Sequence, residues 1–203
     1  MGVDGPVDGQ WNFDHDNRES FGRKGPSGIP APKLFDADAV TSQVFQLVEN
    51  RFSDYPGNPD HFHLPVTSQQ VVEFLDHFVA KLLPNFGQYE DAMWPDEAFL
   101  YHSRLSVLLN VKLISARQCV DAAYQSGHSP INSGEGFVRR ILGWREFIRG
   151  IYWLKMPEYV TLNHLDHQHS LPSFFWDGKT QMNCVQQSMQ HVLNLRIHIT
   201  FTG

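Results

Sequence analysis

The sequence predicts an all-α fold for its ordered part, residues 36–193. Apolar residues recur at helical spacing in several segments, and residues that cap helix N-termini precede those segments. No segment alternates between apolar and polar residues as a half-buried strand does. Because 41% of the 203 residues are hydrophobic and 13% are aromatic, the chain can bury one core of ordinary size.

Residues 1–35 have the composition of an interdomain linker. They contain six of the fifteen glycines and several prolines, and they show little apolar periodicity. A domain seldom begins with such a stretch. We therefore expect another segment to precede it.

The first two helices have recognisable N-termini. Asp38 can cap a helix whose apolar positions fall on one face. A connection rich in proline, glycine and asparagine follows at 54–66. Thr67 and Gln70 then form the pattern of a capping box ahead of a second apolar run. Pro84 lies just past that run and predicts the end of the helix.

Two further helices are expected in the middle of the chain. Ser115 is predicted to cap a helix that runs through Tyr124 and stops near Gly127. The longest helix is predicted to start at Asn132 or Ser133.

The longest helix carries a clear apolar stripe and has a clear end. Pro157 is predicted to end it, and Thr180 is predicted to cap a last helix over 181–193. The stripe consists of Phe137, Ile141, Trp144, Ile148 and Ile151.

Overall charge and cysteine content narrow the class of protein. The net charge of −6 does not indicate a nucleic-acid binder as a whole. Residues 139–155, however, carry five cations against one carboxylate, Glu146, and such a patch could hold phosphates. Two cysteines cannot form a disulfide framework, and no apolar run approaches the length of a membrane span. A cytoplasmic protein with no membrane partner is the simplest interpretation, and the sequence does not define an oligomeric state.

Two short segments could carry chemistry, and each has two interpretations. In "GWREFIRGIYWLKMPEY", residues 143–159, Arg145 and Arg149 share a helix face. They are either the polar edge of a core helix or part of a surface for a flat, anionic molecule. In "FLYHSRLSVLLN", residues 99–110, Ser103 and Ser106 are either ordinary helix caps or an anion site.

Together these segments resemble a known family. "HSRLS" followed by "WREFIRGIYW" is similar to the photolyase/cryptochrome proteins. "WNFDHDNR", "LPNFGQYEDAMW" and "GEGFVRRILGWREFIRGIYWLKMPEY" resemble one branch, the bacterial cryptochrome/(6-4) photolyases with an iron–sulfur cluster, also called deoxyribodipyrimidine photolyase-related proteins. The resemblance runs from about residue 9 to residue 193 and implies the first part of a helical FAD-binding domain.

The resemblance also implies roles for individual residues. Trp144 would face the DNA lesion pocket, and His102 stands where most photolyases have threonine. The resemblance does not assign single roles to the arginines that are general candidates for DNA phosphates. These are Arg139, Arg140 and Arg149. The residues implied for FAD are Tyr89, Ser103, Leu105 and Ser106 near the phosphates and Arg145 beside the isoalloxazine ring.

The metal and electron-transfer residues of the family are only partly present. Cys184 is either a small core residue or the counterpart of the first of four ligands of a 4Fe–4S cluster, and Cys119 is a poor substitute for the missing ones. We expect this chain to hold neither that cluster nor the lumazine-type antenna of the intact family. Trp176 either passes electrons or packs in a loop. Zinc bound by His164, His167 and His169 is a competing interpretation, although no cysteine or carboxylate anchors it.

The end of the chain departs from the family. A catalytic histidine pair is implied at the positions of Ile199 and Thr200, so the family's catalytic residues are missing here. Residues 194–203 are therefore interpreted as an off-family tail, with a frameshift as the explanation.

The sequence thus predicts a fragment of a light-driven, FAD-dependent DNA photolyase or a related cryptochrome. The family's reaction, a carbon–carbon lyase reaction, repairs (6-4) photoproducts in UV-damaged DNA. We expect the fragment itself to be inactive. The alternative is a non-enzymatic helical module that binds DNA or protein without flavin.

Overall fold

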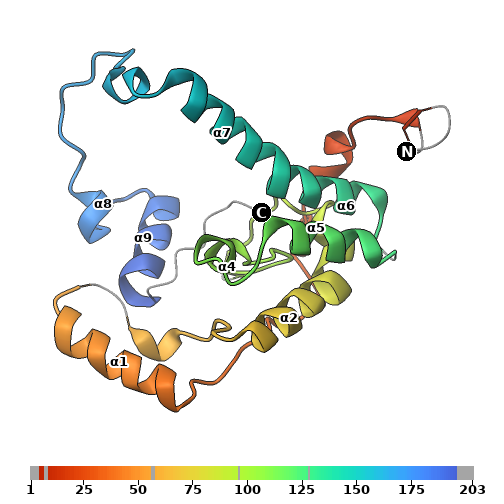
Figure 1. Cartoon of the computed structure of the whole chain (residues 1–203). Helices are drawn as coiled ribbons and strands as arrows, with labels where there is room; N and C mark the ends of the chain where they lie inside the picture. The colour runs from red at the N-terminus through yellow and green to blue at the C-terminus, as the bar shows by residue number, and fades with distance from the viewer. Residues whose placement is uncertain (1–4, 7–8, 56–57, 96, 128, 196–203) are drawn as a thin grey trace. The chain divides into compact units, whose positions relative to one another are not determined.

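The computed structural model describes residues 5–6, 9–55, 58–95, 97–127 and 129–195 (Figure 1). Its regular elements in these ranges are all helical, which confirms the predicted all-α class. The chain divides into two compact units. Of the described residues, the first unit contains those within 1–33 and 65–153, and the second contains those within 34–64 and 154–195. Among the described helices, none combines the length and the apolar character needed to cross a membrane.

The first unit contains the helices α2 to α6 and most of α7. The short η2 helix spans Asp14–Asn17, and two π-helical segments, η4 and η5, interrupt longer helical runs. The bounds are α2 Ser68–His77, η4 Phe78–Leu82, α3 Leu83–Phe86, α4 Ser106–Asn110, α5 Ala116–Gln125, α6 Ile131–Val138, η5 Arg139–Gly143 and α7 Trp144–Lys155.

The start of α2 is as predicted, but the end of its helical run is not. The Thr67 hydroxyl accepts the Gln70 N–H at 3.3 Å, and the Gln70 amide oxygen accepts the Thr67 N–H at 3.2 Å. This is the predicted capping box. The prediction that Pro84 ends the helix is wrong, because the chain stays helical through η4 and α3. Pro84 occupies the first turn of α3, where its missing N–H leaves no helical hydrogen bond unmade.

The predicted α5 is confirmed at both ends. Ser115 forms a capping box with Gln118, whose N–H donates to the Ser115 hydroxyl at 3.2 Å. The helix ends at Gln125, and Gly127 follows with a φ of 60°, a conformation that glycine adopts without strain.

The long helix begins slightly earlier than predicted. Helix α6 starts at Ile131, and neither Asn132 nor Ser133 caps it. The Asn132 amide instead donates to the Asn17 side chain at 2.9 Å, and the Ser133 hydroxyl donates to the Pro84 carbonyl at 3.2 Å. Their polar groups are thus used in contacts with distant segments. The run continues through η5 and α7 (Figure 1) and ends at Lys155, before Pro157 as predicted.

The core of the first unit is built around three phenylalanines from three segments. Phe78, Phe86 and Phe137 are each at most 1% exposed. Their ring centroids lie 5.0 to 5.9 Å apart, the separation of favourable edge-to-face and tilted pairs. This cluster joins η4, α3 and α6 and so supports the start of the long helix.

The second unit contains α1, α8, α9 and the short helices η3 and η6. The Asp38 carboxylate accepts the Thr41 N–H at 2.7 Å, which confirms it as the cap of α1. The apolar stripe of α1 is exposed, however, with Val40 67% accessible. The last helix starts at Asn183 rather than 181. The bounds are α1 Ala39–Phe52, η3 Pro59–His61, η6 Glu158–Thr161, α8 Phe174–Asp177 and α9 Asn183–Leu195.

Candidate functional site

A cavity of about 480 Å³ lies in the first unit beside η5 and the start of α7. Its volume falls within the range of sites for small organic molecules. Three of the four residues predicted for DNA, namely Arg139, Arg140 and Trp144, lie on its wall. The full lining consists of Asp14, Asn17, Glu90, Gly136, Arg139, Arg140, Gly143, Trp144 and Phe147.

Arg140 is held at this cavity by two carboxylates. Its Nη2 lies 3.2 Å from Glu90 Oε1 and 2.9 Å from Asp91 Oδ1. The Arg140 side chain is 21% exposed and that of Glu90 only 3%. Charge-assisted hydrogen bonds of this kind fix the plane of a guanidinium group. Arg140 is therefore a pre-positioned cation.

Arg139 is paired in a similar way. It contacts Glu135 one turn earlier on the helix, donates to the Asn12 amide oxygen at 2.9 Å and lies 3.8 Å from Asp14 Oδ1. A hydrogen bond from Arg18 lowers the pKa of Asp14. The cationic excess seen in residues 139–155 is thus offset by carboxylates from other segments.

Glu90 is the most buried ionisable group of the cavity. Burial raises the pKa of its carboxyl, and the hydrogen bond from Arg140 opposes that rise. A Cβ added at Gly136 would lie 3.0 Å from Glu90 Oε2 and 2.8 Å from Asn17 Nδ2. The glycine therefore lets both polar side chains lie directly against α6.

The other wall of the cavity is aromatic. Trp144 and Phe147 form an edge-to-face pair with centroids 6.0 Å apart. They are 56% and 61% exposed, although both are large and apolar. A flat heteroaromatic group could pack on these rings and place its polar edge near the Arg140–Glu90 pair.

The residues predicted for the flavin do not line this cavity. Tyr89 stacks on Phe21 at 4.4 Å and on Tyr101 at 5.7 Å. Ser103 and Leu105 are 6% and 1% exposed. The main-chain groups of Leu105 are also engaged, because its N–H donates to the Ser103 hydroxyl and its carbonyl accepts the Leu109 N–H.

The remaining residues of the "HSRLS" turn show how it is built. The Ser103 hydroxyl accepts the Leu105 N–H at 3.4 Å. Ser106 is the first residue of α4, and no side chain caps the N-terminus of that helix. The simple interpretation of Ser103 and Ser106 as helix caps is therefore wrong. Burial lowers the pKa of His102, and the charge of Arg140 acts in the same direction.

The two α7 arginines differ in their surroundings. Arg149 pairs with Glu146 at 3.3 Å, and both side chains are 67% exposed. Arg145 is exposed and acts electrostatically on Cys119 of α5. Burial of Cys119 outweighs the effect of the Arg145 charge and raises the pKa of the Cys119 thiol to about 11.

The predicted metal and electron-transfer residues lie in the second unit. Cys184 is exposed at the start of α9, and Trp176 is 70% exposed in α8. No group of three or more histidines, cysteines or carboxylates within the described ranges has the geometry of a metal site, and this includes His164, His167 and His169. The positions of Ile199 and Thr200 lie outside the described residues.

Sequence reasoning missed the polar floor of the cavity. Asn17, Glu90 and Gly136 all lie in segments that carried the family resemblance, but they received no role. The signal that could have found them is the pairing of an acidic segment, "YED", with two adjacent arginines, since buried arginines require carboxylate partners.

Comparisons with known proteins agree with the resemblance. Residues 1–64 match the family model described as deoxyribodipyrimidine photo-lyase-related protein. The chain is 41% identical over 189 residues to a (6-4) photolyase of Agrobacterium fabrum, an alignment covering 91% of this chain and 37% of that protein. It is also 28% identical over 96 residues to an uncharacterized protein of Acanthamoeba polyphaga mimivirus, covering 45% of this chain and 73% of that protein. The chain thus spans 37% of the length of the Agrobacterium protein, and it belongs to the deoxyribodipyrimidine photo-lyase-related family.

Proposed function

We propose that this chain contributes the lesion-facing surface of a light-driven, FAD-dependent DNA photolyase that acts on (6-4) photoproducts. The observation that carries the proposal is the cavity of about 480 Å³, with its exposed Trp144–Phe147 wall and its fixed Arg140–Glu90 pair. The name of the Agrobacterium relative supports the choice of lesion.

The cavity has the two properties that an extrahelical base requires. A base leaves the duplex only if its π-face finds a new partner and its polar edge finds new hydrogen bonds. The exposed rings of Trp144 and Phe147 supply the first. Arg140 and Asn17 supply polar groups at the cavity wall. A flipped, damaged pyrimidine pair fits this combination.

The flavin would lie against a different group of residues. When bound and photoexcited in its reduced form, FAD supplies an electron to the lesion. Ser106, the first residue of α4, could hold its phosphates, with Leu105 beside it. Arg145, exposed on α7, could lie beside the ring. Tyr89 and Ser103 complete the proposed contacts.

The residues present do not fit an iron–sulfur cluster. Four thiolates are the usual ligands, and this chain has two cysteines. The Cys119 thiol is fully buried, and its raised pKa disfavours the thiolate. A cytoplasmic location, with both thiols reduced, is part of the same proposal.

A second candidate is a helical module that binds damaged DNA without flavin. One observation favours this candidate. The cavity is assembled within the first unit, and none of the residues proposed to hold FAD belongs to its lining. The chain spans 37% of the Agrobacterium relative, and a part of that size is compatible with either function.

Two measurements on the 203-residue chain separate these candidates. After incubation with FAD and gel filtration, a flavin absorption band that co-elutes with the chain supports the enzyme, and its absence supports the module. Binding of a (6-4)-containing oligonucleotide should be stronger than binding of the undamaged one. Trp144→Ala should abolish that preference, whereas Trp153→Ala, on the same helix but outside the cavity, should retain it. Equal binding of both oligonucleotides by the unaltered chain would contradict both candidates.

A further inference from the structure

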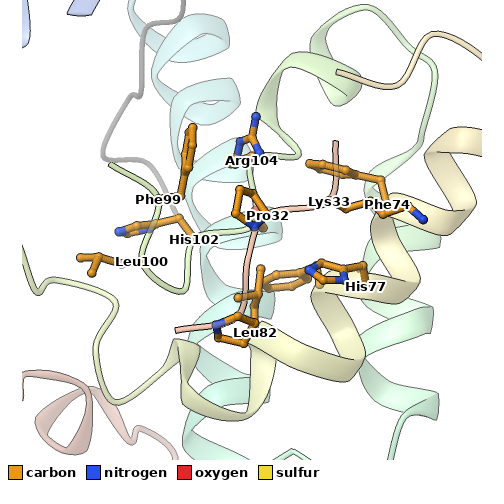
Figure 2. A pocket seen from close by; sticks show the side chains of 12 residues that line it. Pro32, Lys33, Phe74, His77, Leu82, Phe99, Leu100, His102 and Arg104 are labelled. Carbon is orange, nitrogen blue, oxygen red and sulfur yellow. The ribbon is translucent and has the colours of Figure 1, made fainter. Parts of the chain in front are cut away.

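Arg104 of the "HSRLS" turn occupies an unusual environment in the first unit. Its φ of 58° lies in the left-handed region, which residues with a side chain adopt at a cost. Its guanidinium carbon lies 4.1 Å from the centroid of the Phe99 ring and 5.7 Å from that of Phe74. Figure 2 shows the guanidinium group between these two rings. The turn thus places the Arg104 guanidinium group between the rings of Phe99 and Phe74.

This cation lacks a counter-charge within the described part of the chain. Arg104 Nη1 is buried and makes no hydrogen bond there, and none of the ion pairs formed by the described residues includes Arg104. Burial lowers the pKa of Arg104, and no carboxylate acts against that effect. Two aromatic faces stabilise a guanidinium only in part. Arg104 is half-buried, and its buried, unsatisfied Nη1 donor favours a further partner.

A small cavity adjoins Arg104; most of its wall is apolar, and the ionisable residues in the wall are basic. Lys33, His77 and His102 line it together with Arg104, and no aspartate or glutamate belongs to the lining (Figure 2). The neighbouring carboxylate, Glu73, pairs with Lys33 at 3.4 Å.

The histidines do not provide the missing counter-charge either. His77 Nε2 lies 3.1 Å from the Ala31 carbonyl, so this nitrogen donates. His102, like His77, can offer only a neutral or a positive ring. The groups around this small cavity therefore favour an anion over a cation.

The volume of the small cavity selects the kind of anion. It measures about 10 Å³, which is room for one particle of about the size of a water molecule. A phosphate or sulfate ion is several times larger. Among anions, a single-atom ion comes nearest to this size, and it brings a negative charge that no residue of the lining supplies.

We propose that the small cavity at Arg104 binds one monatomic anion of the chloride class. This site is separate from the cavity at Trp144, and it does not depend on the function proposed above. The anion accepts a hydrogen bond from Arg104 Nη1. It thereby stabilises the turn that carries Ser103 and Leu105.

Halide-dependent stability tests the proposal. The Tm of the 203-residue chain is measured in bromide and in gluconate at constant total ionic strength. Each tenfold increase in bromide above its Kd should raise the Tm by roughly 3 to 5 °C, because the anion binds only the folded chain. Sulfate and phosphate should not reproduce the effect, because they do not fit.

Two variants assign the effect to Arg104. Arg104→Met should lose the bromide dependence. Arg117→Met, which alters an arginine with an 89% exposed side chain on α5, should keep it in full. General salt effects should be the same in both variants. Loss of the bromide dependence in Arg117→Met would overturn the proposal.

A direct readout covers the case in which Arg104→Met does not fold. Bromide NMR line widths should broaden with the unaltered folded chain and sharpen when the chain is unfolded by urea. The absence of this excess broadening would overturn the proposal. Stabilisation by acetate but not by bromide would also overturn it, because the site would then belong to a carboxylate of another protein segment.

Discussion

Arg140 lies 3.2 Å from the carboxylate of Glu90, a residue fifty positions earlier in the chain. The pair connects η5 to the segment that follows α3 and closes one wall of the cavity. A carboxylate that is almost fully buried depends strongly on its one cationic neighbour. The stability of the fold around this cavity, and the change of that stability with pH, should therefore depend on the Arg140–Glu90 pair.

Arg140→Met should destabilise the fold by about 1 to 3 kcal/mol, because it leaves Glu90 buried without its cation. Urea denaturation measures the free energy of unfolding. Arg149→Met is the matched control on the same helical run, and its exposed pair with Glu146 should contribute less than about 1 kcal/mol. Equal losses in the two variants would show that Glu90 does not need Arg140.

Glu90 should make stability fall as the pH rises above the ordinary carboxyl range. Burial raises its pKa above the ordinary value of 4.5, so the folded chain binds this proton more tightly than the unfolded chain. The stabilisation is complete below pH 4.5 and is lost as the pH rises through the raised folded-state pKa. Glu90→Gln should remove this component from the pH profile of the free energy of unfolding. A variant profile parallel to that of the unaltered chain would contradict the assignment.

Gly87→Ala should destabilise the contact between α3 and α6. The added Cβ would lie 2.6 Å from the Ser133 Cα, and a backbone atom cannot move aside easily. We expect a loss of about 1 to 3 kcal/mol in urea denaturation. Gly134→Ala, in α6 with no atom near its Cβ, should instead stabilise the helix by about 0.5 to 1 kcal/mol. A change of the same sign in the free energy of unfolding for both substitutions would contradict the close contact between Gly87 and Ser133.

The two cysteines should differ sharply in reactivity. Cys184 is exposed, whereas Cys119 is fully buried with a thiol pKa of about 11. A disulfide reagent should therefore modify one thiol in the folded chain and two in urea. Cys184→Ser should abolish the reaction of the folded chain. Rapid modification of Cys119 without urea would show that α5 opens readily.

DNA binding should depend on Arg149 more than on Arg140. Both were predicted to contact phosphates, but Arg140 is already engaged by Glu90 and Asp91. Arg149→Gln should flatten the slope of log K against log salt by roughly 1. Arg140→Gln should change that slope by less. The reverse order would show that Arg140 exchanges its carboxylates for phosphates.

Features that depend on neighbours within one helical turn could be predicted from the sequence. Thr67 and Ser115 form capping boxes with residues three positions later, and Asp38 caps α1 in the same way. The all-α class and the family also follow from local patterns, since helical periodicity and short motifs are properties of contiguous residues.

Features that depend on distant segments were decided by the tertiary structure. Ser133 was available as a cap, but its hydroxyl bonds to Pro84, forty-nine positions away. Arg140 of η5 is balanced by Glu90 and Asp91, and no pattern within residues 139–155 could show this. A polar side chain satisfies whichever partner lies nearest in the folded chain. Local pattern therefore determined where helices form, and long-range packing determined which charges remain available for function.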